Sequence, residues 1–523
     1  MATKKASIPS ASLQELAENR LLKKLRSYLG DTPQIKDALE FSERCHRNFK
    51  RNSGDPYVLH PIAVASRLAD IKSDRETLVA ALLHDVLEDT DASPDQIKKK
   101  FGQQVLGLIE SLTKLSQISI KKSWFPFSKV EKKEMEQFDH QIENLRKMLV
   151  SVAQDVRVIL IKFSDRIHNL QTLGFLPQVK RERIAREAIE IYAPIAERLG
   201  IGEWKGELED LAFPHLYPKE YKEIKERFTP KIEQKEKDLK SIVLDIKKVL
   251  DENQIKSEIH FRMKKWFSLF KKLRKYSFDE SKIYDLIAVR IIVDSVEDCY
   301  KTLGLIHSMY MPLIGRIKDY IAFPKPNGYR SIHTTVICKK GTVTEFQIKT
   351  SEMHFQAEFG VAAHWLYDKE KKSANVPKNM IGWLTDFTKM QKGAPTSELA
   401  DSFKMDFFQD RIFVFTPDGD VKNLPLGATP VDFAYSVHTW LGNHCAQAKV
   451  NEKIAPLDAR LKNGDQVEII PKKNGRPRED WLKFVKTHLA RSQIKHETRL
   501  AGRWESLRPA HQIKKIKKRF KKK

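Results

Sequence analysis

The sequence contains few cysteines, and no two of them lie close together. Its 523 residues include only Cys45, Cys299, Cys338 and Cys445. Because no CxxC pair occurs, we expect neither a disulfide scaffold nor a zinc knuckle built from cysteines.

Long hydrophobic segments are also missing. No apolar run approaches the roughly 18 residues that span a bilayer. The first residues, MATKKASIPSAS, lack the apolar core of a signal peptide. We therefore expect a soluble, cytoplasmic protein with no membrane as a partner.

Acidic residues are too few to balance the basic ones. The chain has 69 Asp and Glu against 94 Lys and Arg, which gives a formal charge of +25. This excess predicts anionic partners such as nucleotides, RNA or the ribosome. Eight of the last ten residues, KKIKKRFKKK, are basic. That tail is expected either to bind RNA through counterion release or to be disordered.

The glycine motifs that usually hold phosphates are absent as well. Neither GxxxxGK[ST] nor a strand-linked GxGxxG occurs, so we expect no P-loop and no dinucleotide cradle. Phosphate binding would then depend on side chains. A series of cations suits this role: Arg262, Lys264, Lys265, Lys271, Lys272, Arg274, Arg316, Lys318 and Lys325.

Hydrophobic periodicity divides the chain into several regions, and its length predicts three or four domains. Residues 1–200 have mostly helical spacing, and 205–252 are charged with apolar residues at helical intervals. An α/β region follows, with a buried strand at 286–293 and a hairpin between 334 and 348. The last pattern is a small half-open sheet at 409–472, with strands at 411–415, 448–450 and 467–470 and one helix at 430–440.

One group of polar residues predicts a metal site. His84 and Asp85 precede Glu88 and Asp89 in a segment that we interpret as one helix, rich in Ala, Leu and Val. The i, i+4 spacing stacks His84 over Glu88 and Asp85 over Asp89. A structural helix would not usually bury four such groups.

Two distant residues complete the candidate ligand set. His60 precedes Pro61, and Asp165 lies in another helical pattern, so His60, His84, Asp85 and Asp165 are the expected ligands. Two nitrogens and two carboxylates suit Mn²⁺ or a similar cation, which activates water and polarises phosphate. Glu88 and Asp89 would orient or deprotonate that water.

A second group predicts a nucleotide site. Asp285 enters the buried strand, and Glu345 lies in the hairpin. One carboxylate among many cations could hold Mg²⁺, while another takes a proton from a sugar hydroxyl. Tyr329 follows the Asn327-Gly328 turn and could stack on a base.

Long motifs in both regions resemble the RelA/SpoT homologue (Rel) family. They are RNSGDPY at 51–57, HDVLEDT at 84–90, IYDLIAVRIIV at 283–293, GRIKDYIA at 315–322, NGYRSIHTTV at 327–336 and EFQIKT at 345–350. The resemblance implies a multidomain chain: an all-α HD-type hydrolase domain, an α/β nucleotidyltransferase-like synthetase domain with a mixed sheet, and a small β-grasp TGS domain. It also implies synthesis of (p)ppGpp from ATP and GDP or GTP, its hydrolysis with Mn²⁺, and a place in the stringent response.

The resemblance further assigns roles to single residues. Asp285 would bind Mg²⁺, Glu345 would activate the 3′-hydroxyl and Tyr329 would stack on guanine. The implied contacts with nucleotides are Arg51, Asn169, Thr172, Arg262, Ser268, Lys272, Arg316, Lys318, Lys325, Asn327, Tyr329 and His333. The basic RxKD motif at 316–319 is the version that accompanies bifunctional members.

Four positions depart from the family pattern. Gln171 and Arg330 stand where Arg and Gln are usual, and Met263 and Phe267 replace Pro and Tyr. The intact ligands and carboxylates still predict both activities.

The third region resembles a TGS domain, which in this family meets the end of uncharged tRNA on the ribosome. His438 and His444 are the candidate contacts, or else they pack against a small helix. The helical, zinc-finger and ACT regions of long members are not expected. The predicted boundaries are 1–200, 201–255 for connecting helices, 256–395, 408–472 and 473–523.

Two alternatives stay open. The chain could be an RNA- or ribosome-binding regulator with vestigial or weak enzymes, as its basic charge and TGS-like region favour. It could also be an HD phosphohydrolase, active on other nucleotides, with a silent synthetase half.

Overall fold

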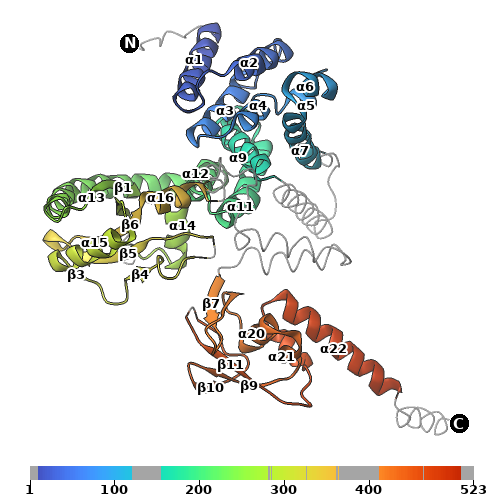
Figure 1. Ribbon diagram of the computed structural model, residues 1–523, viewed down its shortest axis with the longest axis vertical. Helices are drawn as coiled ribbons and strands as arrows, with labels where there is room; N and C mark the ends of the chain where they lie inside the picture. Colours follow the sequence, from blue (N-terminus) through green and yellow to red (C-terminus); the bar gives the residue numbers. More distant parts are fainter. Residues whose placement is uncertain are drawn as a thin grey trace. The chain divides into compact units, whose positions relative to one another are not determined.

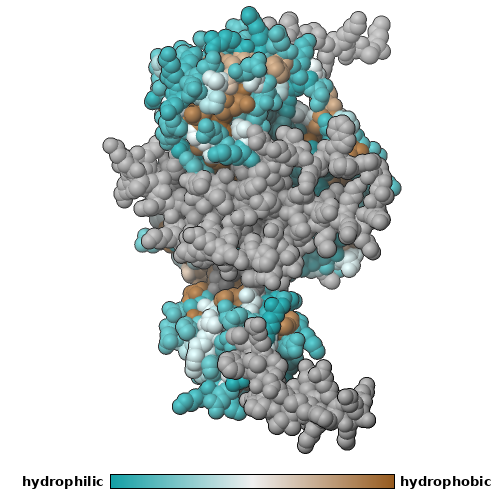
Figure 2. Space-filling view, turned by 90° about the vertical axis from the view of Figure 1, so that its right-hand side faces the viewer, coloured by the Kyte–Doolittle hydropathy of each residue, from teal (hydrophilic) through white to brown (hydrophobic). Residues whose placement is uncertain are grey.

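The computed structural model describes residues 10–120, 155–280, 283, 286–325, 327–360, 363, 411–462 and 464–507. They form two compact units, one containing the described residues up to 363 and the other those from 411 onward (Figure 1). On the face drawn in Figure 2 the described surface is largely hydrophilic, with separate hydrophobic patches. No described helix is long and apolar enough to cross a membrane.

The first part of unit 1 is helical, as predicted. α9 forms its centre, because almost every residue from Val156 to Ile167 is buried. The helices are α1 (Ser10–Leu29), α2 (Pro33–Cys45), α3 (Leu59–Asp70), α4 (Arg75–Leu82), α5 (Val86–Asp89), α6 (Pro94–Phe101), α7 (Gln103–Ile120), α9 (Val156–Gln171), α10 (Gln178–Glu187), α11 (Ala193–Arg198) and α12 (Gly202–Leu216). A π-helical turn at Ala188–Tyr192 joins α10 to α11.

The single helix predicted around His84 is wrong. α4 ends at Leu82, and α5 begins only at Val86, so His84 and Asp85 lie in the turn between them. Because α4 ends at Leu82, the carbonyl oxygen of Ala81 has no backbone donor from a following helical turn. The His84 ring hydrogen-bonds to this oxygen instead. This turn places His84 and Asp85 side by side.

The second part of unit 1 contains a mixed sheet in the order β1-β2-β6-β5-β3, with β4 paired to β5. Its strands are β1 (Ser257–Met263), β2 (Ile287–Val293), β3 (Met311–Pro312), β4 (Lys318–Asp319), β5 (Ile332–Ile337) and β6 (Val343–Thr350). β2 and β6 are parallel, and the other pairs are antiparallel. The predicted strand at 286–293 and the predicted hairpin are confirmed.

One face of this sheet is apolar and covered by helices. Phe346 and Ile348 on β6 share a core with α13 (Pro218–Glu252) and α15 (Val296–Met309). α13 is therefore more than a connecting helix. α14 (Trp266–Lys275) and α16 (Ser351–Phe359) complete this part, and the other face of the sheet is left for polar side chains.

Unit 2 contains two small antiparallel sheets. β7 (Arg411–Phe415) pairs with β8 (Val421–Pro425), and β9 (Cys445–Val450) pairs with β10 (Lys453–Ala455) and β11 (Val467–Pro471). The predicted helix at 430–440 is two helices, α20 (Pro430–Val437) and α21 (Thr439–Asn443), because His438 is extended and caps the second. A 3-10 turn (Glu479–Lys483) and α22 (His488–Leu507) follow. Residues 364–410, at the predicted boundary between the second and third regions, and the basic tail lie outside the described residues.

Two glycines hold the helical part of unit 1 against the end of α16. Gly200 follows α11 with φ +74°, and Gly360 follows α16 with φ +53°. A Cβ on Gly360 would collide with the carbonyl oxygen of Leu199 and the backbone of Gly200. Only glycine allows this contact between backbones.

We expect Gly360→Ala to destabilise unit 1 by about 2 kcal/mol or more, since it adds both strain and a collision. The matched control is Gly304→Ala in α15, where an added Cβ meets nothing within 4 Å. That change should be neutral or stabilise by up to about 1 kcal/mol. Urea unfolding of both variants checks this, and equal stabilities would contradict it.

Candidate active sites

The structure brings the four predicted metal ligands together in the helical part of unit 1. His60 lies on α3, His84 and Asp85 in the turn before α5, and Asp165 on α9. Nε2 of His84 is 3.1 Å from Asp85 Oδ2, and Nε2 of His60 is 3.5 Å from Asp85 Oδ2 and 3.3 Å from Asp165 Oδ1. The ligand atoms of His60, His84 and Asp85 all lie within 4.8 Å of one another.

The His84 ring is oriented like a metal ligand. Its Nδ1 lies 2.8 Å from the carbonyl oxygen of Ala81, so Nδ1 carries a proton and Nε2 is the nitrogen left to bind a metal. Nε2 is buried and faces Asp85 Oδ2. Burial alone lowers the pKa of His84, but the charges of Asp85 and Asp165 outweigh it and raise the pKa to about 9. Without a metal, a proton therefore occupies Nε2.

Arg51 and His168 lie beside the His60 ring. Arg51 Nη1, which can only donate, lies 2.8 Å from Nδ1 of His168. Burial, followed by the charges of His60 and Arg51, lowers the pKa of His168 to about 3, so this Nδ1 is an acceptor. Nδ1 of His60 lies 2.8 Å from the same atom and 3.2 Å from Arg51 Nη1. Nε2 of His60 faces Asp85 and Asp165.

The two carboxylates remain ionised despite burial. Burial raises their pKa values, but the nearby cationic groups outweigh it, chiefly Lys162 at Asp165 and His84 at Asp85. Lys162 Nζ is 3.0 Å from Asp165 Oδ2. Two imidazole nitrogens and two carboxylates thus share one buried space, an arrangement that fits a divalent cation.

The predicted catalytic carboxylates lie beside this cluster on α5. The hydroxyl of Tyr57 donates to Asp85 Oδ2 at 2.7 Å and lies 2.8 Å from Asp89 Oδ2. Tyr57 thereby links a metal ligand to a more exposed carboxylate, while Glu88 is half-buried. The predicted site residues did not include Tyr57, Lys162 or His168.

Two predicted nucleotide contacts border the cluster. Arg51 Nη2 donates to Asn169 Oδ1 at 2.6 Å, so both side chains lie at the same edge of the metal-ligand cluster. Thr172 caps the end of α9, with its hydroxyl 3.3 Å from the carbonyl oxygen of His168.

The predicted synthetase residues gather on the polar face of the mixed sheet. Strand register places Arg290, Gln347, His333 and Lys318 in one row across β2, β6, β5 and β4. Glu345 precedes Gln347 on the same face, because side chains alternate along a strand. Sequence analysis missed Arg290, Gln347 and Lys349, although positions 345, 347 and 349 show this alternation of polar residues.

Glu345 is held by two neighbours. Nδ1 of His333 lies 2.9 Å from Glu345 Oε1, and Gln347 Nε2 donates to the same oxygen at 3.1 Å. Arg262 Nη1 in turn donates to Gln347 Oε1 at 3.2 Å. His333 is thus a neighbour of the predicted base in this structure.

The remaining synthetase residues occupy several places. Tyr329 is half-buried, with Lys325 Nζ 5.0 Å from its ring centroid. Asn327 donates to the carbonyl oxygen of Glu197 at 3.2 Å. Asp285 lies outside the described residues. The others are Ser268 and Lys272 on α14, Arg316 before β4 and Lys318 on β4.

In unit 2 the two candidate tRNA contacts differ. Nδ1 of His438 accepts a hydrogen bond from the backbone of Trp440, and this ring caps α21. His444 stacks on Trp440, whose side chain is 51% exposed, with ring centroids 4.6 Å apart. The pair offers an aromatic surface to solvent.

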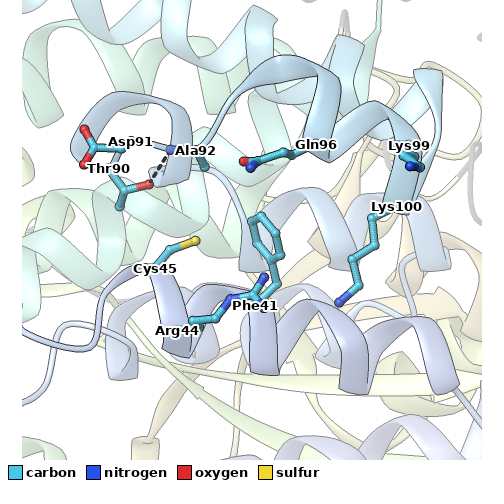
Figure 3. A pocket seen from close by; sticks show the side chains of 9 residues that line it. All are labelled: Phe41, Arg44, Cys45, Thr90, Asp91, Ala92, Gln96, Lys99 and Lys100. Atoms are coloured by element: carbon cyan, nitrogen blue, oxygen red, sulfur yellow. Dashed lines mark hydrogen bonds between the residues drawn. The ribbon is translucent and has the colours of Figure 1, made fainter.

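A hollow of about 800 Å³ lies between α2 and α6 and contains none of the predicted site residues (Figure 3). Arg44 and Lys100 extend over the ring of Phe41, 5.1 Å and 5.6 Å from its centroid. Thr90, at its edge, follows Asp89 directly.

Comparisons with known proteins agree with this arrangement. Residues 38–202 match an HD domain, 261–372 match a region found in RelA / SpoT proteins, and 412–471 match a TGS domain. An HD domain of this type implies a divalent metal.

Two curated relatives cover most of the chain. A guanosine-3′,5′-bis(diphosphate) 3′-pyrophosphohydrolase from Aquifex aeolicus is 43% identical over 480 residues, which are 91% of this chain and 66% of that protein. A GTP pyrophosphokinase from Myxococcus xanthus is 41% identical over 92% of this chain and 62% of its own length. This chain therefore spans slightly less than two thirds of these relatives. Among solved structures, small alarmone synthetase 2 from Bacillus subtilis is 26% identical over 32% of this chain and 92% of its own, with a TM-score of only 0.24.

The protonated Nε2 of His84 predicts a pH dependence of metal binding. A cation must displace this proton, so affinity should increase with pH up to about 9, where the pKa lies, by about tenfold per pH unit. Calorimetric titration with Mn²⁺ as the probe, between pH 6 and 8.5, measures this.

His84→Ala should abolish that binding, while His496→Ala, at an exposed position of unit 2, should leave it intact. An affinity that does not change with pH, or that survives His84→Ala, would contradict the assignment.

Proposed function

Because the chain belongs to the RelA/SpoT family, we propose that it both makes and destroys (p)ppGpp, at two separate sites of unit 1. One site transfers pyrophosphate from ATP to the 3′-hydroxyl of GDP or GTP. The other hydrolyses the 3′-pyrophosphate. The observation that carries the proposal is the coexistence of the buried His60, His84, Asp85 and Asp165 cluster with the polar sheet face around Glu345.

The hydrolase site is proposed to bind Mn²⁺ through His60, His84, Asp85 and Asp165. When bound, the cation supplies stabilisation of the charge that develops on the pyrophosphate. Arg51 and Asn169 would hold the nucleotide next to it. Asp89 is exposed and held by Tyr57, so it is suited to orient the attacking water, and Glu88 to share that task.

The synthetase site is proposed to use Glu345 as the general base. It would take the proton of the 3′-hydroxyl, which then attacks the β-phosphorus of ATP while AMP leaves. Mg²⁺ is assigned to Asp285, on the basis of the family motif. The cations Arg262, Lys318 and Lys325 would bind phosphates, with further contacts from Ser268, Lys272, Arg316 and Asn327.

Unit 2 and the basic tail are proposed to bind uncharged tRNA and the ribosome. The exposed Trp440–His444 stack supports an RNA contact, since aromatic rings can stack on unpaired bases. Together these contacts would place the protein in the stringent response, in the cytoplasm.

Two carboxamide variants test the two-site proposal. We expect Glu345→Gln to lower synthesis of ppGpp from ATP and GDP by about a hundredfold or more while hydrolysis continues. Asp85→Asn should abolish hydrolysis and spare synthesis. Both substitutions keep the shape of the side chain, and chromatography of labelled nucleotides measures both reactions.

Asp298→Asn on α15 is the control, because this side chain accepts a hydrogen bond from Ser295, the N-cap residue of the same helix. It should affect neither reaction. Hydrolysis without synthesis in the wild type would instead indicate a phosphohydrolase with a silent nucleotide domain, and loss of both activities in either variant would contradict separate sites.

A further inference from the structure

A chain of hydrogen bonds extends from Glu345 into the interior of the protein. Nδ1 of His333 contacts Glu345, and Nε2 of the same ring lies 2.8 Å from the hydroxyl of Tyr329. That hydroxyl is 3.4 Å from Nζ of Lys349. Four titratable side chains thus form one continuous series, and Lys349 is the innermost.

Lys349 is an unusual residue to find at this place. It lies on β6 with 0% of its surface exposed, although lysine is almost never fully buried. Within the described part of the chain its only hydrogen bond is to Tyr329. Since Lys349 cannot touch a ligand in solvent, its hydrogen bond to Tyr329 is its connection to the site.

The surroundings of Lys349 are mainly cationic. The acidic group near Lys349 among the described residues is Glu358, which Arg290 contacts at 2.9 Å. The charged and titratable groups that face it come from β1, β2, the segment before β5, and α16: Arg262, Arg290, Lys325, Tyr329, His354 and Glu358. No described carboxylate neutralises Lys349 directly.

The donor capacity of Lys349 sets the direction of the series. An ammonium group has three donors and no acceptor, so it can only donate to the Tyr329 oxygen. The Tyr329 hydroxyl hydrogen is then left to point at Nε2 of His333. A neutral His333 that accepts at Nε2 carries its proton on Nδ1, and this proton is directed at Glu345.

A neutral amine would remove this constraint, because it can also accept a hydrogen bond. Tyr329 could then donate to Lys349, and His333 could switch its proton to Nε2. The lone pair of Nδ1 would face the carboxylate of Glu345 and repel it.

We propose that Lys349 is a positioning residue of the synthetase site: as a pure hydrogen-bond donor it orients the Tyr329 hydroxyl, fixes the tautomer of His333 and so holds the Glu345 carboxylate in place. This inference rests on the proposed function, in which Glu345 accepts the proton of the 3′-hydroxyl. It gives His333 a role in orienting the base.

The charge of Lys349 makes this role dependent on pH. Burial, followed by the charges of Arg290 and Arg262, lowers its pKa to about 7. The ammonium form is present below that pH and is lost above it, so kcat/KM for synthesis should decrease as the pH increases through 7. The phosphates of bound nucleotides favour the ammonium form, so the decrease in kcat should come at a higher pH.

The experiment compares wild type, Lys349→Met, Lys349→Arg and Tyr329→Phe in the synthesis of ppGpp from ATP and GDP between pH 6 and 9. Lys349→Met should lower kcat by at least about tenfold, since a histidine held in the wrong tautomer is a poor partner for the base. KM should change much less. Lys349→Arg should restore most of kcat and lose the decline above pH 7, because guanidinium is a pure donor that does not titrate.

Tyr329→Phe separates the hydroxyl from the ring. This variant keeps the aromatic ring that would stack on the guanine base, but it should show the same loss of kcat as Lys349→Met. The double variant should be no worse than either single one, because both changes interrupt the same series. Thermal unfolding shows whether Lys349→Met folds. If it does not fold, Tyr329→Phe tests the same series of hydrogen bonds.

Wild-type kcat and pH profile in Lys349→Met, an unchanged decline above pH 7 in Lys349→Arg, or additive losses in the double variant would each overturn the positioning role. A wild-type protein that hydrolyses ppGpp but makes none at any pH would contradict the proposed synthetase function instead. Hydrolysis by the same preparations shows that unit 1 is folded.

Discussion

The need for a cation between buried imidazoles and carboxylates determines much of the helical part of unit 1. Nε2 of His60 and Nε2 of His84 lie within 3.5 Å of the Asp85 carboxylate, and a proton or a metal ion between these groups balances their charge. The break between α4 and α5 places His84 and Asp85 side by side. Arg51 and His168 contact the other side of the His60 ring. The break between α4 and α5 thus brings together the imidazoles and carboxylates whose charges must balance.

The proposed synthetase site has the opposite requirement. Its proposed substrates are anionic, and the polar face of the sheet carries several cations. Glu345, the proposed base, needs a fixed orientation there, and Gln347 and His333 contact it directly. The mixed sheet makes this possible because one face packs on α13 and α15 while the other is available for chemistry. Both sites therefore depend on second-layer contacts that fix a tautomer or a rotamer.

The types of secondary-structure element and of site residue could be predicted from the sequence better than the contacts that each residue makes. Helical periodicity, the buried strand and the hairpin were read correctly, because each depends on local spacing. The break at His84 and the extended His438 were missed, since both come from hydrogen bonds that a period cannot reveal. Lys349 was missed for a different reason: a lysine in a strand is usually solvated, and only the fold shows that it is buried.

Anomalous X-ray diffraction at the manganese edge, from crystals grown with Mn²⁺, tests the central claim most directly. The claim is that His84 Nε2 and His60 Nε2 share one cation with Asp85 and Asp165. The account predicts a single strong peak in the helical part of unit 1, bonded to all four side chains. A peak elsewhere in unit 1, or a His84 Nε2 that bonds to protein while the site stays empty, would contradict it.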